Sequence, residues 1–333
     1  MILKHKGNWE NMETQAYACY LKNEEDLKKS SSGGVFTALS NAVFRMGGSV
    51  IACNYNWNAR ELQFDLAQTE DKRNEMRGSK YIQALPNRLY SLLGEELAKD
   101  GGQPILVVGT PCQIAGAKVW YRNKKGKSTR PVVFCDLLCH GVSSPTLWKE
   151  YADEIQQKLD SRIVQLTFKG KEQGWLRPTA KAWLEDGREI LVEDYAMLYR
   201  SRDFMRESCY CCKFAKEERD TDLTIGDYWN IQTVHPAFAN MRGTSNLLVH
   251  TELGQWLFHQ AMGQLMVQES RLEDCIQPAL QHPCEKSKRY RDIHKDYDRY
   301  GIQYIIEKYV HFGPGNAWVR RIRRKWFQMK YRE

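Results

Sequence analysis

Short apolar segments alternate with amphipathic segments along the first 160 residues of this 333-residue chain. The apolar segments predict strands at Gln15–Leu21, Ser49–Asn54, Glu61–Thr69, Pro104–Val108 and Pro131–Leu138. Apolar residues at helical spacing and capping residues predict helices after Gly34 and at Pro86–Lys99, Gln113–Tyr121 and Ser144–Leu159. This alternation is typical of α/β proteins, so we expect a mixed, largely parallel sheet flanked by helices.

The pattern changes after about Asp160. Three short strands are predicted at Ile163–Phe168, Pro178–Leu184 and Glu189–Val192, with a hairpin turn at Glu185–Arg188. Further along, the pattern predicts a helix at Asp194–Arg206, strands at Leu223–Ile225 and Asn246–His250, a helix at Glu252–Met262, and helical chain from Glu285. We therefore expect a main domain at 1–270 with an antiparallel insertion at about 160–193, followed by a helical C-terminal region at 271–333.

Composition indicates a globular protein, because 42% of the residues are hydrophobic and 11% are aromatic. No segment approaches the roughly 18 consecutive apolar residues of a membrane-spanning helix. The first residues also lack the apolar core of a secretion signal. We therefore expect a cytoplasmic protein, and the sequence does not indicate an oligomeric state.

The formal net charge of +8 is concentrated at the C-terminus, where 317–333 contain seven basic residues and one acidic residue. The rest of the chain is nearly neutral, which argues against nucleic acid as a partner. In Trp318–Arg332, aromatic and apolar residues recur at helical spacing opposite the cations. This pattern is typical of a helix lying on an anionic membrane surface, or of a terminal helix docked on the domain with solvated arginines. The first alternative would place the protein at the inner face of a membrane.

Three glycine-containing loops could bind phosphate. Ser30–Gly34 offers hydroxyls and backbone N–H groups at a helix start, and Arg77–Tyr81 offers cations and a ring. Taken alone, each of these two loops is more typical of an ordinary helix cap or surface turn than of a cofactor loop. The third loop, Gly109–Gln113, directly follows a buried strand, and α/β proteins bind ligands at the carboxyl ends of strands.

Ten cysteines without a secretion signal indicate metal binding or catalysis rather than a disulfide framework. Four of them give the ligand number of one iron-sulfur cluster, namely Cys112, Cys139, Cys209 and Cys212. Zinc would accept the CxxC pair as readily, but the wide dispersal of the other two slightly favours a cluster. Cys135 and Cys211 lie close enough in sequence to replace a ligand. No chemistry is assigned to Cys19, Cys53, Cys275 and Cys284, which we expect to be small buried residues.

Six motifs in order carry a resemblance to a known family: Ser-Ser-Ser-Gly-Gly-Val-Phe at 30–36, Arg-Gly-Ser-Lys-Tyr at 77–81, Gly-Thr-Pro-Cys-Gln-Ile-Ala-Gly at 109–116, Cys-Asp-Leu-Leu-Cys-His-Gly-Val-Ser-Ser-Pro at 135–145, Ser-Cys-Tyr-Cys-Cys-Lys-Phe at 208–214, and Asp-Leu-Thr-Ile-Gly-Asp-Tyr-Trp at 222–229. The chain resembles the coenzyme F420 hydrogenase/dehydrogenase beta-subunit family. The similarity is greatest to bacterial members associated with polysaccharide biosynthesis and pyruvyl transferases, and it covers roughly residues 15–280.

The resemblance implies an oxidoreductase that holds FAD close to a [4Fe-4S] cluster and couples a one-electron carrier to a two-electron substrate. By matching positions, Cys112, Cys139, Cys209 and Cys212 are the expected cluster ligands. His140 and Asp227 are the expected groups for orienting the flavin or relaying protons. The expected flavin contacts are Ser31, Ser32, Gly33, Gly34, Arg77, Gly78, Ser79, Lys80, Tyr81, Gly109, Thr110, Pro111, Gln113 and Gly141.

Two departures from the family qualify these expectations. Many relatives carry an N-terminal ferredoxin segment with repeated CxxC spacing, and this chain has only Cys19 before residue 30. We therefore expect an external electron donor such as ferredoxin. No docking surface for F420 is recognisable, so F420 is not expected as the substrate. Two other functions stay open: a zinc-stabilised, inactive scaffold of the same fold, and a thiol enzyme using Cys112 with His140 as base.

Overall fold

The computed structural model describes residues 11–124, 126 and 128–310. The basic segment Trp318–Arg332 lies outside the described residues. Within them, nine strands form one sheet in the order β12-β1-β11-β10-β6-β5-β2-β3-β4. Their bounds are β1 Asn11–Leu21, β2 Ser49–Asn56, β3 Glu61–Ala67, β4 Ala84–Leu85, β5 Ile105–Gly109, β6 Val132–Leu137, β10 Leu223–Asp227, β11 Ser245–Thr251 and β12 Leu265–Ser270.

The centre of the sheet is parallel, because β2 pairs with β5, β5 with β6, and β6 with β10 in the same direction. Antiparallel pairs extend it on both sides, with β11, β1 and β12 beyond β10, and with β3 beside β2. This arrangement confirms the predicted mixed, largely parallel sheet.

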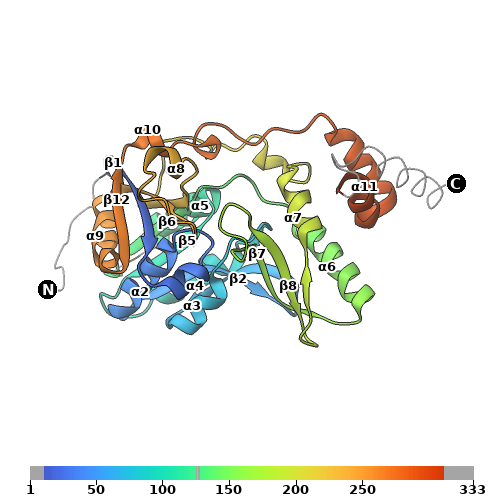
Figure 1. The fold of residues 1–333 in the computed structure, drawn as a ribbon. Helices are drawn as coiled ribbons and strands as arrows, with labels where there is room; N and C mark the ends of the chain where they lie inside the picture. The colour runs from blue at the N-terminus through green and yellow to red at the C-terminus, as the bar shows by residue number, and fades with distance from the viewer. Residues whose placement is uncertain (1–10, 125, 127, 311–333) are drawn as a thin grey trace.

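Alternate residues of the central strands point into two different cores. Ile105 and Val107 of β5 join one core, whereas Leu106 and Val108 join the other. Both cores need a cover, since strands buried on both faces have no solvated side. The helices α1 (Glu24–Lys28), α2 (Val35–Arg45), α3 (Glu70–Met76), α4 (Asn87–Leu97), α5 (Pro111–Lys124) and α9 (Glu252–Ala261) pack around the sheet, whereas α6 (Pro145–Leu159) lies farther out and contacts it at β3 (Figure 1).

The predicted antiparallel insertion forms a separate sheet in the order β7-β8-β9. Its strands are β7 (Ile163–Gly170), β8 (Thr179–Leu184) and β9 (Glu189–Leu191), followed by α7 (Glu193–Arg200). The small sheet lies between the large sheet and the pair α6 and α7, and α11 (Tyr290–Ile305) packs against α6 (Figure 1). The short helices α8 (Ile231–Val234) and α10 (Leu272–Cys275) lie beyond β10 and β12 in the chain. Among the described residues, no helix is both long and apolar enough to cross a membrane.

Two of the element boundaries that differ from the sequence predictions lie close in sequence to predicted ligand cysteines. The helix predicted at Asp194–Arg206 ends at Arg200, because Arg202 adopts a left-handed backbone with φ +60° and turns the chain away. The helix predicted from Gln113 begins at Pro111, so Cys112 lies in its first turn rather than in the preceding loop. Helix α3 escaped prediction because it is almost entirely polar and is recognisable only by its Thr69 cap.

A buried histidine on β11 lies between the two neighbouring strands, β1 and β10, of the large sheet. His250 contacts the hydroxyls of Thr14 and Thr224 at 3.0 and 2.9 Å, and burial lowers its pKa to about 4. The imidazole of His250 therefore becomes protonated at a lower pH in the folded protein than in the unfolded chain. Its contribution to stability is present above the unfolded pKa of 6.5 and is lost as the pH falls toward 4.

We expect the difference in unfolding free energy between the wild type and His250→Gln to decrease by about 3 kcal/mol between pH 7 and pH 4. Denaturant unfolding at several pH values measures this difference. His259→Gln, on the exposed side of α9, is the matched control and should show no such dependence. A difference that stays constant with pH would contradict a neutral buried imidazole at position 250.

Candidate functional site

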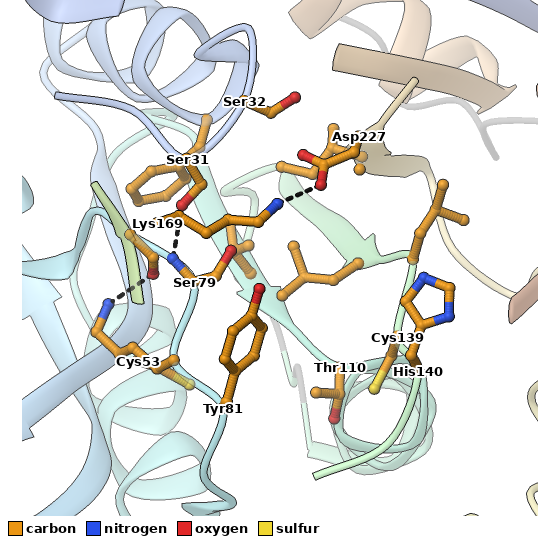
Figure 2. Close-up of a pocket in the computed structure, with 18 of the residues that line it drawn as sticks. Ser31, Ser32, Cys53, Ser79, Tyr81, Thr110, Cys139, His140, Lys169 and Asp227 are labelled. Carbon is orange, nitrogen blue, oxygen red and sulfur yellow. Dashed lines mark hydrogen bonds and ion pairs between the residues drawn. The ribbon is translucent and has the colours of Figure 1, made fainter. Parts of the chain in front are cut away.

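The carboxyl ends of three parallel strands meet at one edge of the large sheet. β5 ends at Gly109, β6 ends at Leu137 and β10 ends at Asp227. The residues that follow them, Thr110 and Cys139-His140, therefore lie next to one another and to Asp227 (Figure 2). This is the position at which open α/β sheets bind ligands.

A cavity of about 520 Å³ opens at this edge, within the usual range for small-molecule sites. It brings together both predicted catalytic residues and twelve of the fourteen predicted flavin contacts. Those residues are His140 and Asp227 with Ser31, Ser32, Gly34, Arg77, Gly78, Ser79, Lys80, Tyr81, Gly109, Thr110, Gln113 and Gly141. Gly33 and Pro111 do not line this cavity.

The serine-glycine loop is fixed by short polar contacts on both sides. Ser31 Oγ accepts a hydrogen bond from the backbone N–H of Ser79 at 2.6 Å, which joins two of the predicted loops (Figure 2). Gly33 faces the sheet instead, where a Cβ would lie 2.1 Å from the carbonyl oxygen of Cys19. Gly33 therefore allows the loop to pack closely on β1, whereas Ser31 and Ser32 before it and Gly34 after it line the cavity.

Arg77 offers unused hydrogen-bond donors at the cavity wall. Its side chain is 6% exposed and its Nη2 contacts Asp26 at 2.7 Å, but Nε and Nη1 have no partner among the described residues. A buried donor without a partner is costly, so this guanidinium is suited to an anionic ligand. The next residue, Gly78, has φ +92° and no atom within 4 Å of a Cβ, so a ligand can approach its backbone.

Lys80 is an expected flavin contact, but its ammonium group already forms hydrogen bonds within the protein. Its ammonium group donates to the carbonyl oxygens of Met76 and Arg77 at 2.7 and 3.0 Å. Burial lowers its pKa to about 8. Lys80 therefore holds its own loop together, and Arg77 is the cation of that loop with free donors.

All four predicted ligand cysteines line a second, smaller cavity of about 50 Å³. Cys112 lies at its exposed side, with Sγ 3.3 Å from Thr110 Oγ1. Burial raises the pKa of Cys139 to about 12, and the neighbouring thiols of Cys112, Cys209 and Cys212 add to the effect. Thiols gathered in this way ionise readily only when a cation neutralises them. No group of three or more His, Cys, Asp or Glu side chains in the described ranges is close enough to hold a single ion.

The six remaining cysteines differ in burial: Cys19, Cys135 and Cys275 are buried, Cys53 and Cys284 are only partly buried, and Cys211 is exposed. Cys135 is fully buried in the core of the sheet, Cys211 is exposed, and neither lines the small cavity. Cys284, to which the sequence assigned no chemistry, does line it, with Sγ 3.5 Å from the carbonyl oxygen of Cys209. Cys284 follows Pro283 in a connection without regular structure, so no periodic pattern could identify it.

The two cavities share a wall. Thr110, Cys139, His140, Gly141, Val142 and Arg202 line both of them. Gly141 has φ +108°, and a Cβ there would lie 3.0 Å from Met205 Sδ, so glycine keeps this wall thin. A group in one cavity would thus be separated from a group in the other by a single layer of residues.

His140 is held as a neutral ring at this wall. Its Nε2 lies 3.2 Å from Gln277 Oε1, and its ring stacks on Trp229 at a centroid distance of 4.8 Å. Burial lowers its pKa, and the charge of Arg202 adds to the effect. Among the described residues His140 forms no hydrogen bond with Cys112, which a Cys–His nucleophile pair would need.

Asp227 forms an ion pair with Lys169 across the larger cavity (Figure 2). Lys169 comes from β7, so the antiparallel insertion contributes directly to the site. Burial alone would lower the pKa of Lys169, but the charges of Asp227 and Tyr81 outweigh it and the pKa is raised. The Lys169 ammonium is therefore charged near neutral pH, where it contacts the carboxylate of Asp227.

Sequence reasoning missed several residues that line the larger cavity, including Lys169, Tyr199, Arg200, Arg202 and Gln277. Tyr199 stacks on Tyr81 with ring centroids 4.0 Å apart. The sequence contains one signal for this group: Arg200 and Arg202 stand two positions apart, shortly before Cys209 and Cys212.

A sequence profile for the C-terminal region of the coenzyme F420 hydrogenase/dehydrogenase beta subunit matches residues 102–274. That range contains the four predicted ligand cysteines and ends before Cys284. The fold is similar to a chain of the F420-reducing [NiFe] hydrogenase complex from Methanosarcina barkeri, with a TM-score of 0.54 and 17% identity. The similarity covers 76% of this chain and 81% of that chain. No curated protein sequence matches this chain.

Proposed function

Because the chain belongs to the family of coenzyme F420 hydrogenase/dehydrogenase beta subunits, we propose that it is an oxidoreductase that uses FAD and a [4Fe-4S] cluster. It would pass electrons between an external one-electron donor of the ferredoxin type and a two-electron substrate. The observation that carries the proposal is the wall shared by the two cavities, one lined by four cysteines and the other large enough for a nucleotide.

The residues of the larger cavity fit a flavin nucleotide. The unpartnered Nε and Nη1 of Arg77 supply donors for a phosphate, and Gly78 leaves room for it beside the backbone. The hydroxyl of Ser31 lies beside this loop, 2.6 Å from the backbone nitrogen of Ser79, and Ser32 also lines the cavity. Arg77, Gly78 and the two serines would therefore hold the phosphates, and Thr110 and Gly141 would lie toward the cluster.

The residues of the smaller cavity fit an iron-sulfur cluster, with Cys112, Cys139, Cys209 and Cys212 as ligands. A flavin supplies hydride or single-electron chemistry and a cluster supplies one-electron transfer. At the shared wall, the neutral imidazole of His140 can donate or accept a proton. Lys169 holds a proton at Nζ beside Asp227 and can orient a polar group of a bound ligand.

The biological setting that we propose is the assembly of surface polysaccharides. Its support is the similarity of the six motifs to family members associated with that process. A role at the inner face of a membrane would depend on Trp318–Arg332, outside the described residues, and we propose it only as part of the same setting.

The visible absorption spectrum of protein purified without oxygen, with analysis of FAD, iron, sulfide and zinc, tests the proposal. We expect flavin bands above a broad thiolate-to-iron shoulder, with about four irons per chain. A colourless protein with one zinc per chain would overturn the proposal and favour an inactive scaffold of the same fold. Reduction of the bound flavin by reduced ferredoxin would then identify the class of donor.

A further inference from the structure

The larger cavity is strongly cationic. Its lining includes one carboxylate, that of Asp227, and five cationic side chains, which are Arg77, Lys80, Lys169, Arg200 and Arg202. Asp227 is already paired with Lys169. A cavity with this charge attracts anions, and it offers more positive charge than the phosphate contacts at Arg77 require.

Three of the five cations are engaged. Arg77 is assigned to the flavin phosphate, the ammonium of Lys80 contacts carbonyl oxygens of its own loop, and Lys169 pairs with Asp227. Among the residues that the structure describes, Arg200 has only a long contact, 3.7 Å, to the carboxylate of Glu193. The guanidinium of Arg202 has no hydrogen bond or ion pair within the described part of the chain. These last two arginines therefore have donors free for a ligand.

Arg202 lies at the wall shared with the cysteine-lined cavity, and not beside Arg77 and Gly78, where we place the flavin phosphates. It lines both cavities together with Cys139 and His140, and its charge contributes to the lowered pKa of His140. Its backbone is held in the left-handed region by hydrogen bonds: its N–H donates to Tyr199 at 3.0 Å and its carbonyl accepts from Tyr210 at 2.6 Å. Such a conformation is costly for an arginine and persists where the surroundings enforce it.

We propose that Arg202, together with Arg200, binds an anionic group, a carboxylate or a phosphate, of the two-electron substrate. The proposal rests on the proposed function, because it assumes that the flavin occupies the phosphate end of the cavity. A guanidinium binds both kinds of oxyanion through parallel N–H donors, and burial strengthens the interaction. The anion would fix the substrate beside His140, which is available for proton transfer. The substrate class is thus an anionic molecule rather than a neutral one.

Titration of the flavin-loaded protein with malonate and, separately, with inorganic phosphate tests this assignment. The readouts are the absorption spectrum of the bound flavin and isothermal titration calorimetry. We expect at least one of the two anions to perturb the flavin spectrum, and Arg202→Gln to weaken its binding tenfold or more. The anion that binds more tightly identifies the chemistry of the substrate group. Arg202→Lys should be intermediate, since it keeps the charge and loses the paired donors.

Arg291→Gln is the matched control, because Arg291 is exposed on α11 and lines neither cavity. Both variants should retain the flavin and iron content of the wild type. The assignment is wrong if neither anion binds the flavin-loaded wild type, or if Arg202→Gln binds them equally well. Loss of flavin from Arg202→Gln would show that Arg202 binds the cofactor, and this result would also overturn the assignment. A wild type without flavin would instead mark the failure of the proposed function, and of this inference with it.

Discussion

Replacement of Cys139 by serine is expected to remove the iron from this protein. Cys139 lies on the wall between the two cavities, and burial keeps its pKa near 12 in the absence of a cation. Serine is a much poorer iron ligand and fills almost the same volume. Iron should fall from about four per chain to nearly none, with loss of the broad absorption shoulder. The flavin bands should remain, because the larger cavity keeps its shape.

Two serine variants serve as controls for this loss. Cys211→Ser changes an exposed thiol outside the small cavity and should keep its iron. Cys284→Ser removes the fifth thiol of the cavity and should also keep it, since Cys284 lies beyond the matched family region. Retention of four irons by Cys139→Ser would contradict the proposed ligand set. Loss of iron from Cys284→Ser would show that Cys284 replaces one of its members.

The large sheet could be predicted because its strands are buried on both faces. Segments such as Ile105–Val108 are continuously apolar, and the helices between them have regular apolar spacing. Two other elements, α3 and β12, have no apolar pattern long or regular enough to predict them. Helix α3 buries only Arg73 and Met76, and β12 is an edge strand of three apolar and three polar residues, of which only Leu265 is buried. Their formation depends on neighbours that are distant in sequence, such as the pairing of β12 with β1.

The loops after β5 and β6 could be placed at the site because the carboxyl ends of parallel strands meet at one edge, whereas Ser30–Gly34 and Arg77–Tyr81 follow helices and could be identified only as motifs. The sequence could not show that β7 of the insertion extends Lys169 to Asp227, since 58 positions separate them. It also could not distinguish Arg77 from Lys80, which lie in one motif. Only the fold shows that the carbonyls of Met76 and Arg77 occupy the lysine and leave the arginine donors free.

The second large effect is expected from Arg77→Gln, which should weaken flavin binding about tenfold to a hundredfold. The change removes the buried Nη1 donor that lacks a protein partner, together with the positive charge at the phosphate end of the cavity. Fluorescence titration of the flavin-depleted protein with FAD measures the dissociation constant. Arg88→Gln is the control, because Arg88 is exposed on α4 and does not line the cavity.

A loss of flavin from Arg77→Gln could also arise from the broken contact with Asp26, so a second variant is needed. Gly78→Ala leaves that ion pair intact and directs a methyl group toward a space with no protein atom within 4 Å. If a phosphate lies there, Gly78→Ala should weaken FAD binding more than it lowers the unfolding free energy, which strain at φ +92° reduces by only about 1 kcal/mol. Unchanged FAD affinity in both variants would show that the flavin phosphates bind elsewhere. Loss in both, together with retention of flavin by Arg202→Gln, would assign the two ends of the cavity to cofactor and substrate respectively.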